Sequence, residues 1–204
     1  MITALGSIAA QQSKGTDNTY ADTLWLLNYA ATHPNAKIRY TASNMILYIH
    51  SDAPYLSETQ AYSRASGQYL LGDELPYMTT PPTNRPRLNG PIHSISQIMS
   101  NVMGSAAEAE IGAAYINGQE SVLIRTLLCK LGHPQPATPI QGDNSTSYGF
   151  ANDTIKQKRS KAIDMRFYWI RDRTSQGQFL IYWQPSITNL GKYHTKHHSP
   201  AHQQ

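Results

Sequence analysis

The sequence predicts an α/β fold in which a five-stranded mixed sheet is flanked by helices. Three observations predict it. Residues 45–49 form a continuous apolar run, which is typical of a strand buried on both faces, although a short buried helix would show the same pattern. A long amphipathic helix begins after Ser105. Between and after them, short apolar segments first follow one another and then alternate with helical segments, which favours a mixed sheet.

The five predicted strands are short apolar segments bounded by turn-forming residues. Between the second and third of them, residues 73–90 contain four prolines, which cannot join the interior of a sheet. We therefore predict a long surface loop there. The strands are predicted at residues 45–49, 65–71, 92–103, 138–142 and 179–183.

The predicted helices are delimited by capping residues and by proline. The first 18 residues are a polar stretch in which no element is predicted, and His33-Pro34 ends the first helix. In the longest helix, Ser105 and Glu108 have the spacing of a capping box. Asn144 or Ser145 can cap a short helix that ends near residue 151. The other helices are predicted at residues 19–31, 105–131 and 160–173, with a last short one from about Asn189.

Length and composition indicate one globular domain. The chain has 204 residues, of which 40% are hydrophobic and 15% charged. Its single cysteine, Cys129, excludes an internal disulfide, and its apolar surroundings predict a core thiol. No apolar stretch reaches the length of a membrane span, and no secretion signal opens the sequence. We expect an intracellular protein, cytoplasmic or nuclear, that does not bind membranes.

The positive charge is concentrated in one segment. Residues 156–173 contain seven basic and two acidic residues, a local charge of +5, whereas the other residues contain ten basic and eleven acidic residues, a charge of −1. Such a concentration favours a polyanionic partner such as nucleic acid. A solvated basic helix face would give the same pattern.

Three carboxylates lie where predicted elements begin or end. Asp52 follows the first strand, Asp143 follows the fourth, and Glu110 lies in the first turns of the long helix. If the first and fourth strands are neighbours, the three side chains converge. Asp is also a common turn residue, and this alternative stays open from the pattern alone.

Six short motifs carry a resemblance to a known family: HSDAPYLSE, SRASGQYLL, SAAEAEIGA, QGDNSTSYG, KAIDMRFYWIR and NLGKYHTKHH. In type and spacing, they resemble the ribonuclease H (RNase H) domain of copia-type LTR retrotransposon polyproteins, which lies C-terminal to the reverse transcriptase. The resemblance implies an RNase H-like fold over residues 41–198, a remnant of the connection to the reverse transcriptase in residues 1–40, and a polar tail in residues 199–204. The polymerase core is not in the sequence, so a separate reverse transcriptase core is a candidate partner. The sequence does not indicate an oligomeric state.

The resemblance also implies an activity. The family hydrolyses the RNA strand of RNA–DNA hybrids by two-metal catalysis, with Mg²⁺ (Mn²⁺ as an alternative) held by four carboxylates. Asp52, Glu110 and Asp143 match the first three as catalytic residues and metal ligands. Glu108 is better explained by its capping role. Lys158, Arg159, Lys161 and Arg166 are the expected phosphate-binding residues, and Ser51, Asn144 and Ser145 are further candidates for contacts near the site.

The fourth carboxylate position departs from the family. The family motif (G/A)-D-x-x-T-K reads Gly191-Lys192-Tyr-His-Thr195-Lys196 here, so Lys192 replaces the fourth ligand. At an effective dielectric of ~20, a unit-charge pair at ~5 Å is worth roughly 3 kcal/mol, so we expect weakened binding of one metal ion and low or no cleavage. Two hypotheses follow: an impaired hybrid-specific ribonuclease, or a degenerate module that binds nucleic acid without cutting it. The histidines at positions 194, 197, 198 and 202 lack cysteine or acidic partners and predict a solvated tail, not a zinc site.

Overall fold

A computed structural model of the chain describes residues 2–74, 87–152 and 161–195, without the side chains of residues 150–151 and 161–164. The chain divides into two compact units, Met1–Arg39 and Tyr40–Gln204. The first unit contains α1 (Ile2–Ala10), the 3₁₀ turn η1 (Gln12–Lys14) and α2 (Asp17–Thr32). Thr16 caps α2 in a reciprocal capping box with Thr19. The helix in residues 2–10 was not predicted.

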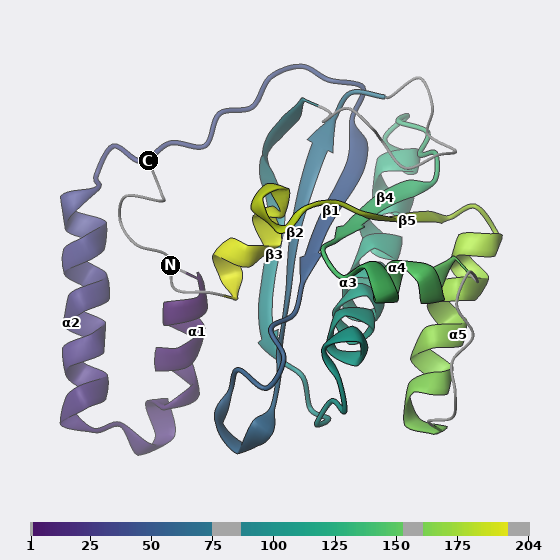
Figure 1. The fold of residues 1–204 in the computed structure, drawn as a ribbon. Coiled ribbons are helices and arrows are strands. Elements are labelled where there is room, and N and C mark those ends of the chain that lie inside the picture. The colour runs from purple at the N-terminus through teal and green to yellow at the C-terminus, as the bar shows by residue number, and fades with distance from the viewer. Residues whose placement is uncertain (1, 75–86, 153–160, 196–204) are drawn as a thin grey trace. The chain divides into compact units, whose positions relative to one another are not determined.

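The second unit is built on the five-stranded mixed sheet that the sequence predicts (Figure 1). Its strand order is β3-β2-β1-β4-β5, so β1 is central. It pairs antiparallel with β2 and parallel with β4, and β4 pairs parallel with β5. The first and fourth strands therefore lie side by side, which the sequence had left open. The strands are β1 (Ile46–Asp52), β2 (Arg64–Gly72), β3 (Leu88–Ile98), β4 (Thr138–Gly142) and β5 (Phe179–Trp183).

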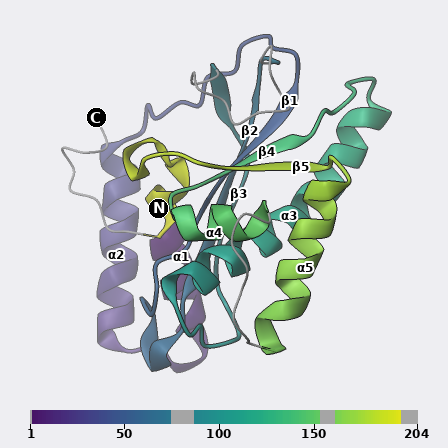
Figure 2. The ribbon, with the colours of Figure 1, turned by 45° about the vertical axis from the view of Figure 1, so that its right-hand side comes forward.

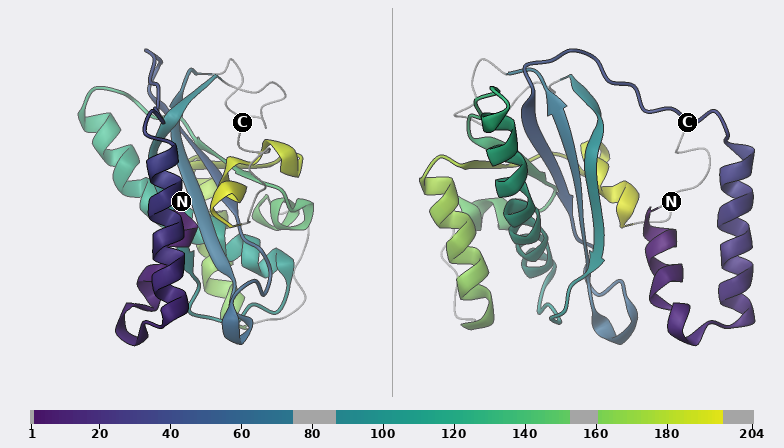
Figure 3. Two further views of the ribbon diagram at one scale, coloured as in Figure 1. Left: turned by 90° about the vertical axis from the view of Figure 1, so that its left-hand side faces the viewer. Right: turned by 180° about the vertical axis from the view of Figure 1, so that it is seen from behind.

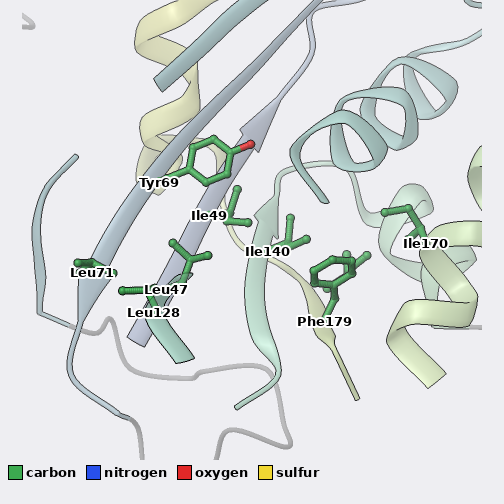
Figure 4. Close-up of a cluster of buried hydrophobic side chains, with 9 residues drawn as sticks. Leu47, Ile49, Tyr69, Leu71, Leu128, Ile140, Ile170 and Phe179 are labelled. Atoms are coloured by element: carbon green, nitrogen blue, oxygen red, sulfur yellow. The ribbon is translucent and has the colours of Figure 1, made fainter. Parts of the chain in front are cut away.

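Helices cover one face of this sheet. The helices α3 (Ala106–Lys130) and α5 (Lys161–Ser175) pack against each other, and the short α4 (Ser145–Ala151) follows β4 (Figure 2). Between the helices and the sheet lies the apolar core drawn in Figure 4. Its buried side chains come from every strand except the edge strand β3, and from both long helices: Leu47, Ile49, Tyr69, Leu71, Leu128, Ile140, Ile170, Phe179 and Ile181.

The opposite face of β1 and β2 holds the C-terminal segment (residues 186–195), which forms the 3₁₀ turns η3 (Ser186–Thr188) and η4 (Leu190–His194) (Figure 3). Side chains alternate along a strand, so Leu47 and Ile49 face the helices while His50 faces the segment. Both faces of β1 are covered, and all seven of its residues are buried.

The N-terminus of α3 is capped by Ser105. Its Oγ accepts a hydrogen bond from the Glu108 backbone N–H at 3.2 Å. The Glu108 carboxylate accepts from the backbone N–H of Gly104 and not from that of Ser105. The predicted capping role of Glu108 is confirmed, although its partner is the backbone N–H of Gly104, one residue before the predicted one.

Two predictions, the bounds of the third strand and the burial of Cys129, were wrong. The third strand begins at Leu88 and ends at Ile98, so it includes Pro91 and part of the predicted loop. Proline is tolerated there because β3 is an edge strand with an irregular register beside it. Cys129 is exposed, because the outer face of α3 near its C-terminus has no covering layer among the described residues. The short helix predicted from about Asn189 is present as the 3₁₀ helix η4, with Asn189 as its N-cap. Within the described ranges, no helix is long and apolar enough to cross a membrane.

Candidate metal centre

Two carboxylates reach the same edge of the sheet because β1 and β4 run parallel. Ile49 pairs with Ile140 and His50 with Gln141, so Asp52 and Asp143 leave the sheet side by side. The third carboxylate, Glu110, comes from the first turns of α3. One oxygen of each carboxylate lies within 4.8 Å of the others. The structure therefore brings together the three residues that the sequence singled out.

Glu110 is almost fully buried, with 7% of its surface exposed. Its Oε1 accepts a hydrogen bond from the backbone N–H of Ala53 at 3.3 Å. Burial, followed by the negative charges of Asp52 and Asp143, raises the pKa of the Glu110 carboxyl well above its ordinary value. The Glu110 carboxyl is therefore more easily protonated than an ordinary glutamate.

Asp143 has a positive partner. The Nζ of Lys192 lies 2.8 Å from Asp143 Oδ2, and both side chains are mostly buried. Partial burial disfavours the ionised form of Asp143, but the hydrogen bond and charge of Lys192 outweigh it and lower the pKa of this carboxyl. Lys192, predicted at the fourth ligand position, therefore points into the cluster.

Asp52 is fixed from the same segment. It is buried, with 2% of its surface exposed, and the Thr195 hydroxyl donates a hydrogen bond to its Oδ2. Thr195 belongs to the motif that carries Lys192, but nothing in the local pattern singled it out. The only signal for Thr195 was its position in the family motif, three residues after Lys192.

The C-terminal segment is anchored to three strands by hydrogen bonds that involve buried polar side chains. Gly191 lets the segment approach β1 closely because it has no side chain. A Cβ at this position would lie 3.0 Å from the His50 carbonyl oxygen and 3.2 Å from Asp52 Cβ. The anchoring bonds are Asn189 Nδ2 to Ser51 O (2.7 Å), Leu190 N to His50 Nδ1 (3.0 Å), Ser66 Oγ to Gly191 O (2.7 Å) and Ser96 Oγ to His194 O (2.9 Å). These anchors were not predicted.

The other predicted polar residues near the site have structural partners. Asn144 caps α4, since its Oδ1 accepts from the backbone N–H groups of Thr146 and Ser147. Ser145 is exposed at the start of that helix. Ser51 is buried, and its Oγ accepts a hydrogen bond from Asn117 Nδ2 at 2.9 Å.

The basic residues are described only in part. Arg166 is half-buried, and its guanidinium carbon lies 5.9 Å from the centre of the Tyr115 ring. Lys161 opens α5, and its side chain lies outside the description, as do Lys158 and Arg159 altogether. Among the tail histidines, only His194 is described; it is half-buried, and burial lowers its pKa, contrary to the predicted solvated tail.

The donor set fits one hard cation. Three carboxylates with oxygens within 4.8 Å of one another offer the ligand type that Mg²⁺ or Mn²⁺ prefers. The set does not fit a second ion in the same way, because the ammonium group of Lys192 lies against Asp143.

A solved RNase H domain shows the same fold, and a second solved structure gives a weaker match. A solved structure of the N-terminal RNase H domain of Rv2228c from Mycobacterium tuberculosis, fused to maltose-binding protein, matches with a TM-score of 0.50 and 13% identity, over 74% of this chain and 94% of that one. LC11-RNase H1, solved in complex with an RNA/DNA hybrid, matches with a TM-score of 0.49 and 11% identity, over 71% and 88% of the two chains. No protein-family model matches the chain.

One curated protein is similar to this chain in sequence. The retrovirus-related Pol polyprotein from transposon TNT 1-94 of Nicotiana tabacum is 24% identical over 148 residues, which are 72% of this chain. This chain is an RNase H-like domain related to retroelement polyproteins. The matched region covers 10% of the length of that polyprotein, so the chain spans only a small part of it. The predicted resemblance and fold class are confirmed.

Proposed function

We propose that this RNase H-like domain hydrolyses the RNA strand of RNA–DNA hybrids with the help of Mg²⁺ or Mn²⁺, and that Lys192 impairs the reaction. The observation that supports the proposal is the convergence of Asp52, Glu110 and Asp143, from two parallel strands and one helix. A divalent ion bound by such a site supplies an activated water and stabilises the leaving oxygen.

The residues of the chain have separate tasks in this proposal. Asp52, Asp143 and Glu110 act as metal ligands, and the sheet and helix that carry them keep them in place. Thr195 orients the Asp52 carboxylate by its hydrogen bond. Lys192 reduces the negative charge that attracts metal ions, and this lowers the rate.

The basic segment is the proposed contact with the hybrid. Lys158, Arg159, Lys161 and Arg166 supply positive charge that attracts phosphates irrespective of sequence. We also propose that residues 1–40 correspond to the connection to a reverse transcriptase core, that a separate core is a partner, and that the domain works inside the cell.

A second candidate function is favoured by the ion pair between Lys192 and Asp143. In this alternative the domain binds hybrids through its basic segment and does not cut them. The two candidates share the fold and the partner, and they differ only in whether cleavage occurs.

Cleavage of a labelled RNA–DNA hybrid in Mg²⁺ or Mn²⁺ separates the candidates. We expect slow cleavage by the unmodified chain, none by Asp52→Asn, and faster cleavage by Lys192→Asp. Lys130→Asp is the matched control, because it makes the same change of charge at an exposed position on α3. If the unmodified chain does not cleave and Lys192→Asp does, the non-cleaving module is the correct function. If none of the proteins cleaves, the nuclease proposal is wrong.

A further inference from the structure

The carboxylate site contains an unusual charge balance. Three carboxylates lie within 4.8 Å of one another, and Asp52 and Glu110 are buried. Buried like charges destabilise a fold unless a cation compensates them. Here the ammonium group of Lys192 lies 2.8 Å from Asp143, on a side chain that is only 11% exposed.

The backbone that carries Lys192 is held in place. Gly191, the preceding residue, fits closely against β1, and its carbonyl oxygen accepts from Ser66 Oγ of β2 at 2.7 Å. The Lys192 backbone N–H donates to the Asn189 carbonyl oxygen at 3.3 Å, and Asn189 Nδ2 donates to β1. The backbone that carries the lysine is thus tethered to β1 and β2 and cannot move away from the site without breaking buried hydrogen bonds.

Charge counting relates this lysine to the number of metal ions. The resemblance implies four carboxylates and two divalent ions, a balance of −4 against +4. With all three carboxylates ionised, as metal ligands are, they and one lysine carry −2, which one divalent ion neutralises. A second ion would leave an excess of +2 next to an ammonium group, in a site shielded from water.

We infer that Lys192 is a built-in cation that takes the place of one divalent ion beside Asp143, so that the site is stable without metal and takes up a single divalent ion. The inference rests on the proposed function in one respect, which is the use of the carboxylates as metal ligands. The role of Lys192 as a stabilising cation does not depend on cleavage.

Thermal unfolding in EDTA tests the stabilising role. We expect Lys192→Met to lower Tm by roughly 5 °C or more, because a mostly buried pair loses one partner. Lys130→Met, at an exposed position, is the matched control and should leave Tm unchanged. Mn²⁺ should raise the Tm of Lys192→Met more than that of the unmodified chain, because the ion replaces the missing charge. Equal Tm values for the two variants in EDTA would overturn the inference. If Lys192→Met does not fold in EDTA but folds in Mn²⁺, the inference is supported.

The number of bound ions, measured by Mn²⁺ titration with electron paramagnetic resonance, tests the second part. We expect one Mn²⁺ on the unmodified chain, two on Lys192→Asp and a much weaker site on Asp52→Asn. Two ions on the unmodified chain would overturn the inference and leave the proposed function standing. No ion on any protein would overturn the proposed metal site and the single-ion claim, while the EDTA experiment still decides whether Lys192 stabilises the fold.

Discussion

Asn117 is a buried cross-link between α3 and two strands. Its Nδ2 donates to Ser51 Oγ at 2.9 Å and to the Ser66 carbonyl oxygen at 2.8 Å, and its Oδ1 accepts from the Tyr69 hydroxyl at 3.0 Å. The side chain fits only because Gly67 opposes it: a Cβ at Gly67 would lie 1.8 Å from Asn117 Oδ1. The Asn117 amide group therefore helps to hold the helix that carries Glu110 against the sheet, and the absence of a side chain at Gly67 leaves room for it.

Replacing Gly67 by alanine should displace this amide group. We expect Gly67→Ala to lower the free energy of unfolding by about 2 kcal/mol, because overpacking forces side chains or backbone to move and breaks buried hydrogen bonds. Urea unfolding at neutral pH measures the change. Gly15→Ala is the control, since a Cβ there meets no atom within 4 Å. Equal stability of the two variants would show that the Asn117 pocket relaxes at little cost.

His50 should make the fold sensitive to acid. The side chain is buried, its Nδ1 accepts the Leu190 backbone N–H, and burial lowers its pKa to about 4. The unfolded chain protonates this histidine near its ordinary pKa of about 6.5, so the unfolded state binds more protons between these values and stability falls as the pH drops. At pH 5, the loss is roughly 2 kcal/mol relative to neutral pH.

The variant His50→Asn keeps an acceptor for Leu190 but does not titrate. Its free energy of unfolding should therefore fall less between pH 7 and pH 5 than that of the unmodified chain, measured by urea unfolding at both values. His133→Asn serves as the comparison, because that histidine is more exposed. A variant with the same acid sensitivity as the unmodified chain would place the titration on another group.

At the scale of elements, α3 connects stability to the site. Glu110 lies near the N-terminus of this helix, where Ser105 satisfies a backbone N–H group. We expect Ser105→Ala to cost about 1 kcal/mol in the free energy of unfolding, as is usual for the loss of such a cap. Chemical unfolding measures it, with Ser100→Ala, at an exposed serine just before the helix, as the control. A smaller effect than in the control would mean that Glu108 alone caps the helix.

The elements that the sequence predicts best are those with one dominant local signal. The strands at residues 138–142 and 179–183 agree with β4 and β5, and Ser105 begins the long helix as its capping pattern requires. The third strand was predicted to begin at residue 92, whereas β3 begins at Leu88 and contains Pro91. Proline normally excludes a strand, and it is acceptable here only because β3 lies at the edge of the sheet, which is a property of the tertiary structure. The apolar run that contains Cys129 predicted a core thiol, but Leu127 and Leu131 beside it are exposed as well, so apolar neighbours in the sequence did not determine its burial.

For the whole molecule, the candidate site could be predicted from the sequence only on the condition that the first and fourth strands are neighbours. The pattern placed Asp52 and Asp143 at strand ends, but their meeting depends on the parallel pairing of β1 with β4, which no local signal contains. The resemblance supplied that pairing and identified Lys192 as a departure. The contact of Lys192 with Asp143 and that of Thr195 with Asp52 depend on side-chain geometry, and only the structure provides it.

The charge distribution of the whole chain gives a further prediction. Changing Lys158, Arg159 and Lys161 to alanine should weaken binding to an RNA–DNA hybrid and reduce the slope of log affinity against log salt by about 2, since each phosphate contact contributes somewhat less than one unit. Fluorescence anisotropy at several salt concentrations measures both. The matched control changes Lys14, Lys37 and Lys130, which are exposed and remove the same charge elsewhere. Equal effects of the two triple variants would assign binding to net charge alone.

The contact between Thr195 and Asp52 joins residues that are 143 positions apart in the chain. During synthesis, Asp52, Glu110 and Asp143 are all made before the segment that carries Lys192. Until that segment docks on β1 and β2, the carboxylates do not have the ammonium group of Lys192 beside them. Contacts of such long range are slow to form, and surfaces left open in the meantime are exposed to misassembly. We therefore expect Mg²⁺ or Mn²⁺ to speed refolding of the chain, because the ion can compensate the carboxylates before Lys192 reaches them.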